Sequence, residues 1–234
     1  MPLSGVLPPR TVFVTPIVFI VTALVSVTAI LHPQWTLLLR RDEPAWAAGQ
    51  LWRILTPVLV QPDGWGQLAF NLAGIAILGT AAELRGLSWL ASYAFPAVAS
   101  ICVMYVAAPA DRGGGSSDGV AGLIAALAVV NVARPGGSTR LTEQLARGYS
   151  AFFVSYVAVL SRATEWVAAV FGNVVMIFIL TSSRAWGTAF TNRLLLALVC
   201  VSVPILLVRG NSHGVGLLAG LIAAAFRFRR KGSR

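Results

Sequence analysis

Charged side chains are scarce in this sequence, and acidic ones are the scarcest. Only 11% of the 234 residues are charged, with 8 Asp and Glu against 18 Lys and Arg. Apolar residues make up 57% of the chain, and the mean hydropathy is +0.78. Because a soluble globular domain carries about 25% charged residues, this composition excludes that class and indicates a membrane protein.

Cysteine and histidine are also rare, with 2 residues of each type. Cys102 and Cys200 both lie in apolar segments, where a thiol behaves as a small buried side chain. The sequence contains no cluster of histidine and cysteine, no phosphate-binding glycine loop and no dinucleotide-binding motif. We therefore expect no disulfide, no metal site and no cofactor.

The apolar residues form runs that are long enough to cross a bilayer. A helix of about 20 residues, rising about 1.5 Å per residue, spans a hydrocarbon layer of about 30 Å. The sequence predicts an all-α membrane protein, a six-helix transmembrane bundle that forms one domain over residues 1–234. The predicted spans are 12–31, 67–82, 88–108, 117–133, 193–209 and 212–228.

An apolar insertion, about residues 134–190, separates the fourth predicted span from the fifth. Its most apolar part, 149–181, is interrupted near Arg162 and Glu165. Two short helices and one interfacial segment both fit this pattern, so the form of the insertion stays open.

The net charge of +10 does not indicate nucleic-acid binding, because the basic residues lie in loops and tails rather than along one helix face. A basic tail, residues 227–234, follows the last span and places the C-terminus in the cytoplasm by the positive-inside rule. Six spans then place the N-terminus there too. We expect a multi-pass protein of the plasma (inner) membrane, with the lipid bilayer as its partner. Glu83 and Arg85 are expected to pair at the cytoplasmic surface.

A few polar side chains lie inside predicted spans, where polarity is costly and indicates function. Gln67 and Asn71 lie four residues apart in the second span, Ser117 begins the fourth, and His213 begins the sixth. A histidine must approach a serine oxygen to within about 2.6 to 3.2 Å to take its proton. The number of crossings between Ser117 and His213 must therefore be even, and residues 149–181 must contribute zero or two.

Small residues line the helix faces below this serine and this histidine. On the serine's helix, the positions four and eight residues further on share a face with the serine. On the histidine's helix, the positions three and seven residues further on share a face with the histidine. These positions are Ala121, Ala125, Gly216 and Gly220. Two such smooth faces can pack closely, which would bring the two side chains together at one depth.

Three blocks of sequence carry a further pattern. The first runs from Trp52 and Arg53 through Asn71 to Tyr93 and includes Gly79, Glu83 and Gly86. The second is Gly115-Ser116-Ser117-Asp118 with Gly122, and the third is His213 with Gly216 and Gly220. In this order, the three blocks resemble the rhomboid family of intramembrane serine proteases.

The resemblance implies a rhomboid-like fold and an endopeptidase that cleaves single-span membrane proteins through a Ser-His dyad. It implies that Ser117 is the nucleophile and His213 the base. Asn71, Gln67 and the backbone N–H of Ser117 would bind the oxyanion. Further structural roles are implied for Gly115, Gly122, Gly216, Gly220, Trp52 and Arg53.

The chain departs from the family pattern at three positions. Gln67 replaces a histidine, Asp118 replaces the glycine that follows the nucleophile, and Ala121 replaces an aromatic ring beside the histidine. A carboxylate about 6 Å from an oxyanion opposes it by roughly 3 kcal/mol at an effective dielectric of about 20. If Asp118 instead points away, it stabilises the first turn of its helix.

Other readings of these residues stay open. Asn71 and Gln67 can instead link helices by hydrogen bonds, and Trp52 and Arg53 can anchor the chain at lipid headgroups. The chain can be a catalytically inactive rhomboid-like protein that binds transmembrane helices. It can also be a small transporter or an accessory subunit of a membrane complex.

Overall fold

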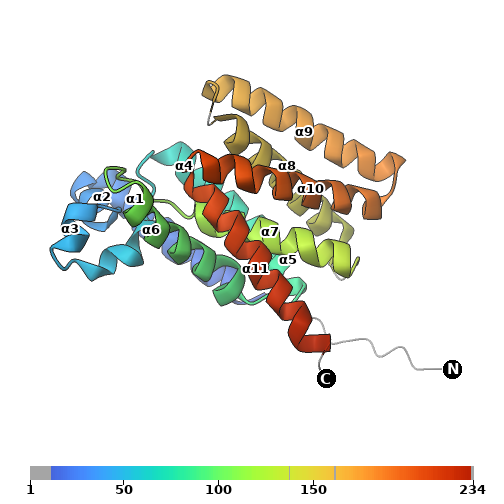
Figure 1. Cartoon of the computed structure of the whole chain (residues 1–234), viewed down its shortest axis with the longest axis horizontal. Coiled ribbons are helices and arrows are strands. Elements are labelled where there is room, and N and C mark those ends of the chain that lie inside the picture. The colour runs from blue at the N-terminus through green and yellow to red at the C-terminus, as the bar shows by residue number, and fades with distance from the viewer. Residues whose placement is uncertain (1–11, 137, 161, 233–234) are drawn as a thin grey trace.

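The computed structural model describes residues 12–136, 138–160 and 162–232, and this part of the chain is helical with no strand (Figure 1). The outer residues of the predicted single domain, 1–11 and 233–234, lie outside it. The elements are α1 (Val14–Leu31), α2 (Pro33–Leu39), α3 (Glu43–Ala47), η1 (Leu51–Ile54), η2 (Thr56–Leu59), α4 (Trp65–Gly74), η3 (Ile75–Gly79), α5 (Thr80–Leu84), η4 (Leu90–Ala94), α6 (Phe95–Ala107), α7 (Ser117–Ala133), α8 (Arg140–Leu160), α9 (Glu165–Ala185), α10 (Thr188–Val208) and α11 (Ser212–Gly232).

Five of the described helical segments are long and apolar enough to cross a membrane. They are Val14–Leu31, Trp65–Leu84, Leu90–Ala107, Glu165–Ala185 and Thr188–Val208. Two shorter apolar helices, Ser117–Ala133 and Ser212–Arg227, accompany them. The all-α membrane bundle predicted from the sequence is confirmed, and the six predicted spans fall on these helices to within about five residues.

Helix α7 forms the centre of the bundle, and nearly all of its side chains are buried. Its glycines allow close packing of the segment formed by η4 and α6. A methyl group at Gly119 would lie 2.7 Å from the ring of Tyr93, and one at Gly122 would lie 2.5 Å from Pro96. On another side α7 packs against α11, and it also contacts η2, α4, η3, α5 and α10.

The segment left open in the sequence forms two helices of 21 residues each, α8 and α9. The first ends at Leu160 and the second begins at Glu165, near the break that Arg162 and Glu165 indicated. Phe153, Val154 and Val157 of α8 are buried in the same core as α7, so α8 is an integral part of the bundle. Helix α9 lies outside α8 and α10 (Figure 1). That residues 134–190 are an insertion stays a prediction.

The expected pair of Glu83 with Arg85 is wrong. The carboxylate of Glu83 instead accepts bonds from the backbone N–H groups of residues 13–15 and from the Thr15 hydroxyl, which caps the start of α1. Arg85 donates to Glu143 Oε1 at 2.8 Å and to the carbonyl oxygen of Arg134 at 2.6 Å. The free N–H groups of a helix start are the better partner for a nearby carboxylate.

Candidate active site

Helices α7 and α11 run side by side in the same direction and touch through small residues. A methyl group at Gly216 would lie 2.5 Å from the carbonyl oxygen of Asp118 and 3.2 Å from Ala121 Cβ. One turn further on, a methyl group at Gly220 would meet the backbone of Gly122 and lie 3.0 Å from Ala125 Cβ. The contacts follow the same order along both helices, so the first turns of α7 and α11 lie at the same end of the bundle. Ser117 and His213 stand in these first turns.

The loop between α6 and α7, residues 108–116, is called the serine loop here, and it reaches α7 through Gly115. Gly115 has φ +131°, and a Cβ there would lie 2.8 Å from Gln67 Nε2 and 3.2 Å from Gln61 Oε1. Ser116 is fully buried and its Oγ accepts a hydrogen bond of 2.9 Å from Gln61 Nε2. Ser117, one residue on, is half-buried.

The amides that the resemblance assigned to an oxyanion site lie against this loop. Asn71 is fully buried, and its Nδ2 donates to Gln61 Oε1 at 2.7 Å. Gln67 Nε2 donates to the carbonyl oxygen of Gly114 at 3.2 Å, and Gln67 Oε1 accepts from the N–H of Asp63 at 3.1 Å. The sequence reasoning missed Gln61, which joins Asn71 to Ser116 and is 1% exposed. Its only signal was its place next to Pro62 in a loop.

The ring of His213 is held by two residues that the sequence did not indicate. Its Nδ1 lies 2.6 Å from Asn211 Oδ1. The ring packs against Phe153 of α8 in a T-shaped arrangement, with ring centres 5.6 Å apart and planes at 70°. Phe153 thus provides the aromatic neighbour that Ala121 does not. Within the described part of the chain, no hydrogen bond joins Ser117 to His213. The two residues therefore lie at one end of the bundle without a hydrogen bond between them.

Asp118 does not point out to water. Its side chain is buried and its Oδ1 has no hydrogen-bond partner among the described residues. The carboxylate lies near the Ser212 hydroxyl and within electrostatic range of His213. A negative charge there attracts a protonated imidazole and repels a nearby oxyanion. Its two electrostatic effects on a serine-histidine reaction therefore oppose each other.

Arg53 organises the long loop between α1 and α4. Arg53 is 5% exposed. Its guanidinium donates to the carbonyl oxygens of Leu37 and Arg40, at 3.0 and 2.7 Å, and to Gln50 Oε1 at 2.7 Å. These partners account for its burial without a lipid headgroup. Trp52, by contrast, is 45% exposed.

The same long loop is bound to the serine loop. The N–H of Gly115 donates to the carbonyl oxygen of Pro57 at 2.8 Å, and the N–H of Arg41 donates to that of Gly113 at 2.8 Å. The Arg41 guanidinium also pairs with Asp111 at 2.5 Å. The position of Ser117 thus depends on residues far back in the sequence.

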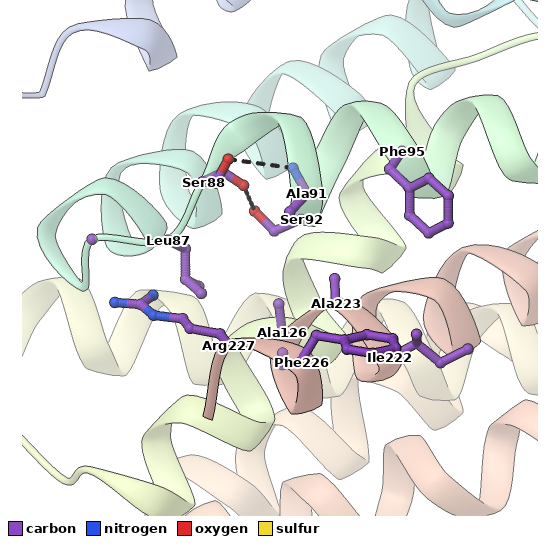
Figure 2. A pocket seen from close by; sticks show the side chains of 12 residues that line it. Leu87, Ser88, Ala91, Ser92, Phe95, Ala126, Ile222, Ala223, Phe226 and Arg227 are labelled. Carbon is purple, nitrogen blue, oxygen red and sulfur yellow. Dashed lines mark hydrogen bonds between the residues drawn. The ribbon is translucent and has the colours of Figure 1, made fainter. Parts of the chain in front are cut away.

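Two cavities of the bundle lie away from this site. The first, of about 670 Å³, is bounded by η4, α6, α7 and α11, and Figure 2 shows Leu87, Ala126, Ile222 and Phe226 around it. Ala126 and Ile222 come nine residues after Ser117 and His213, so they lie about 13 Å deeper along their helices. The second, of about 550 Å³, lies between α8 and α9. Among the described residues, no group of three His, Cys, Asp or Glu side chains could hold a metal ion.

Comparison with known families agrees with this arrangement. A family model described as Rhomboid domain matches residues 48–175, which is more than half of the chain. The chain belongs to the rhomboid family and is a multi-pass membrane protein. Comparisons with curated proteins and with solved structures gave no match.

Proposed function

We propose that this rhomboid-family protein is an intramembrane serine endopeptidase with Ser117 as nucleophile and His213 as base. The observation that carries the proposal is the parallel glycine packing of α7 on α11, which sets the first turns of both helices at one end of the bundle. The substrates would be single-span membrane proteins, and no cofactor is required.

The chemistry follows from these side chains. The Ser117 hydroxyl attacks a peptide carbonyl carbon while His213 Nε2 takes its proton, and the carbonyl oxygen becomes an oxyanion. Asn71, Gln67 and the N–H of Ser117 would stabilise that charge. The imidazolium then protonates the leaving amine, and a water molecule hydrolyses the acyl-enzyme with His213 again acting as base.

The membrane orientation is part of the proposal. In the proposed topology α8 and α9 add two crossings, so the four helices between Ser117 and His213 return the chain to the same side. With the termini in the cytoplasm of a cell with a plasma (inner) membrane, the site lies near the outer face. Arg134, Arg140 and the basic end of α11 then lie on the inner side, as the positive-inside rule favours.

A fluorophosphonate probe tests the proposal in purified, detergent-solubilised protein. We expect the probe to label the wild type and not Ser117→Ala or His213→Ala. Ser116→Ala is the matched control, because it removes the neighbouring hydroxyl, which accepts a hydrogen bond from Gln61 Nε2. If Ser116→Ala lost labelling and Ser117→Ala kept it, the nucleophile would be Ser116, and the assignment to Ser117 would be wrong. No labelling of a folded wild type would overturn the protease proposal.

A second function is favoured by Asp118, whose buried carboxylate lies within electrostatic range of His213. In this alternative, the protein binds transmembrane helices without cleaving them. Asp118→Gly combined with Gln67→His separates the two functions, since it removes the opposing charge and restores the histidine of the family pattern. Labelling that occurs only in this double variant would make the natural protein a binder, whereas labelling of the wild type would make it an enzyme.

A further inference from the structure

The oxygen of the Asn211 side chain contacts two groups of the same histidine. Asn211 Oδ1 lies 3.0 Å from the backbone nitrogen of His213 and 2.6 Å from its Nδ1. Asn211 directly precedes α11, which begins at Ser212, and its carbonyl oxygen accepts from the N–H of Gly214 at 3.0 Å. Its side chain therefore caps the helix in the way that asparagine favours.

The cap fixes which atom of the amide faces the ring. A backbone N–H only donates, so the atom 3.0 Å from it must be the oxygen and not the amide nitrogen. That same oxygen faces His213 Nδ1, and an oxygen of this kind only accepts. In the neutral ring, Nδ1 must then carry the proton, which leaves the lone pair on Nε2.

We propose that Asn211 is a positioning residue that holds His213 in the Nδ1-protonated form, so that Nε2 is free to accept the proton of Ser117. The inference rests on the proposed function, and it turns the expected pair into a chain of three residues. The amide sets the tautomer and the direction of the ring, and it adds no charge of its own.

The other neighbours of the ring agree with this role. Phe153, which is fully buried in α8, meets the ring at 70° and restricts its rotation. The carboxylate of Asp118 on α7 lies within electrostatic range of the ring and would attract the imidazolium once it forms. The Ser212 hydroxyl lies near the Asp118 carboxylate. The orientation of the ring is therefore set jointly by α7, α8 and the cap of α11.

Nitrogen NMR of protein with isotope-labelled histidine reads the tautomer without any activity. The chain has only 2 histidines, so His213→Gln assigns the spectrum and the exposed His32 serves as an internal reference. At a pH where both rings are neutral, we expect a protonated Nδ1 and an unprotonated Nε2 for His213 in the wild type. A His213 ring protonated mainly at Nε2 would overturn the inference.

Asn211→Ser separates the tautomer from the helix cap. Serine caps a helix about as well as asparagine, but its shorter side chain cannot also reach Nδ1. We expect unchanged thermal stability, a shift of His213 toward protonation at Nε2, and at least about tenfold slower labelling by the fluorophosphonate. Asn211→Asp keeps both contacts and should keep the wild-type tautomer. An unchanged tautomer in Asn211→Ser would contradict the inference.

The two proposals fail differently. If His213 is protonated at Nδ1 only when Asn211 is present, but no variant is labelled, then the protease proposal is wrong and the positioning role stands. If Ser117-dependent labelling is as fast in Asn211→Ser as in the wild type, then the protease proposal stands and Asn211 does not position the base.

Discussion

At the scale of single residues, Gly115 has both a positive φ angle and closely packed neighbours. Its φ of +131° strains any other residue, and a Cβ would press on Gln67 Nε2 at 2.8 Å. We expect Gly115→Ala to destabilise the protein by about 2 to 3 kcal/mol, because the alanine adds both backbone strain and a clash. Thermal unfolding in detergent, with fluorophosphonate labelling, measures both effects.

Gly49→Ala is the control for this prediction. Gly49 has φ +93° but open space around it, so its substitution adds backbone strain alone, about 1 kcal/mol. Equal losses in the two variants would show that the contact between Gly115 and Gln67 does not shape the serine loop.

Arg53 gives a second prediction at this scale. Replacing it with leucine removes all the donors that hold Leu37, Arg40 and Gln50, so we expect a loss of about 2 to 4 kcal/mol in detergent. Trp52→Leu, at a 45% exposed side chain, should cost less than about 1 kcal/mol. If Arg53 only anchored the chain at lipid headgroups, its replacement would be neutral in detergent and harmful only in bilayers.

The sequence indicated single residues where a local pattern marks them, and missed those defined by distant contacts. Ser117 and His213 could be chosen because each is a polar residue at the start of an apolar helix. Gln61 and Phe153 could not, since a loop glutamine and an apolar phenylalanine are ordinary locally. Their importance depends on partners 55 and 60 residues away, at Ser116 and His213.

At the scale of helices, the contact of α7 with α11 leaves no space for side chains. A methyl group at Gly220 would meet the backbone of Gly122 itself, which cannot move aside as a flexible side chain can. We expect Gly220→Ala to lower the unfolding temperature and to reduce labelling at least about tenfold, because the two helices must separate. Leu218→Ala, at an exposed position of the same helix, is the control.

Helix α8 shows why some elements could be predicted only in part. The uniform apolar runs of α1, α7 and α11 mark their own positions, and α7 begins and ends where expected. The first half of α8 carries Arg140, Glu143 and Arg147, so the predicted apolar segment began only at 149. Glu143 in fact pairs with Arg85 at 2.8 Å. A pattern of apolar residues along the sequence does not show that a charged residue pairs with a distant partner, so it cannot predict this part of the helix.

At the scale of the whole molecule, the position of the site depends on how many helices cross the membrane between Ser117 and His213. Helices α7, α8, α9 and α10 lie between the two residues, and four crossings return the chain to the side from which it started. If α8 and α9 lay on the membrane surface, two crossings would do the same. A single crossing by α8 and α9 together would instead separate the pair by the thickness of the bilayer.

Cysteine labelling distinguishes these topologies. After Cys102 and Cys200 are replaced by alanine, Thr164→Cys probes the turn between α8 and α9, and Thr188→Cys probes the turn before α10. We expect a membrane-impermeant maleimide to label Thr164→Cys in intact cells and to label Thr188→Cys only after permeabilisation, because α8 carries the chain outward and α9 returns it. Labelling of both only after permeabilisation would place α8 and α9 at the inner surface and leave the dyad intact. Labelling of both in intact cells would leave a single crossing, put Ser117 and His213 on opposite sides, and contradict the serine-histidine mechanism.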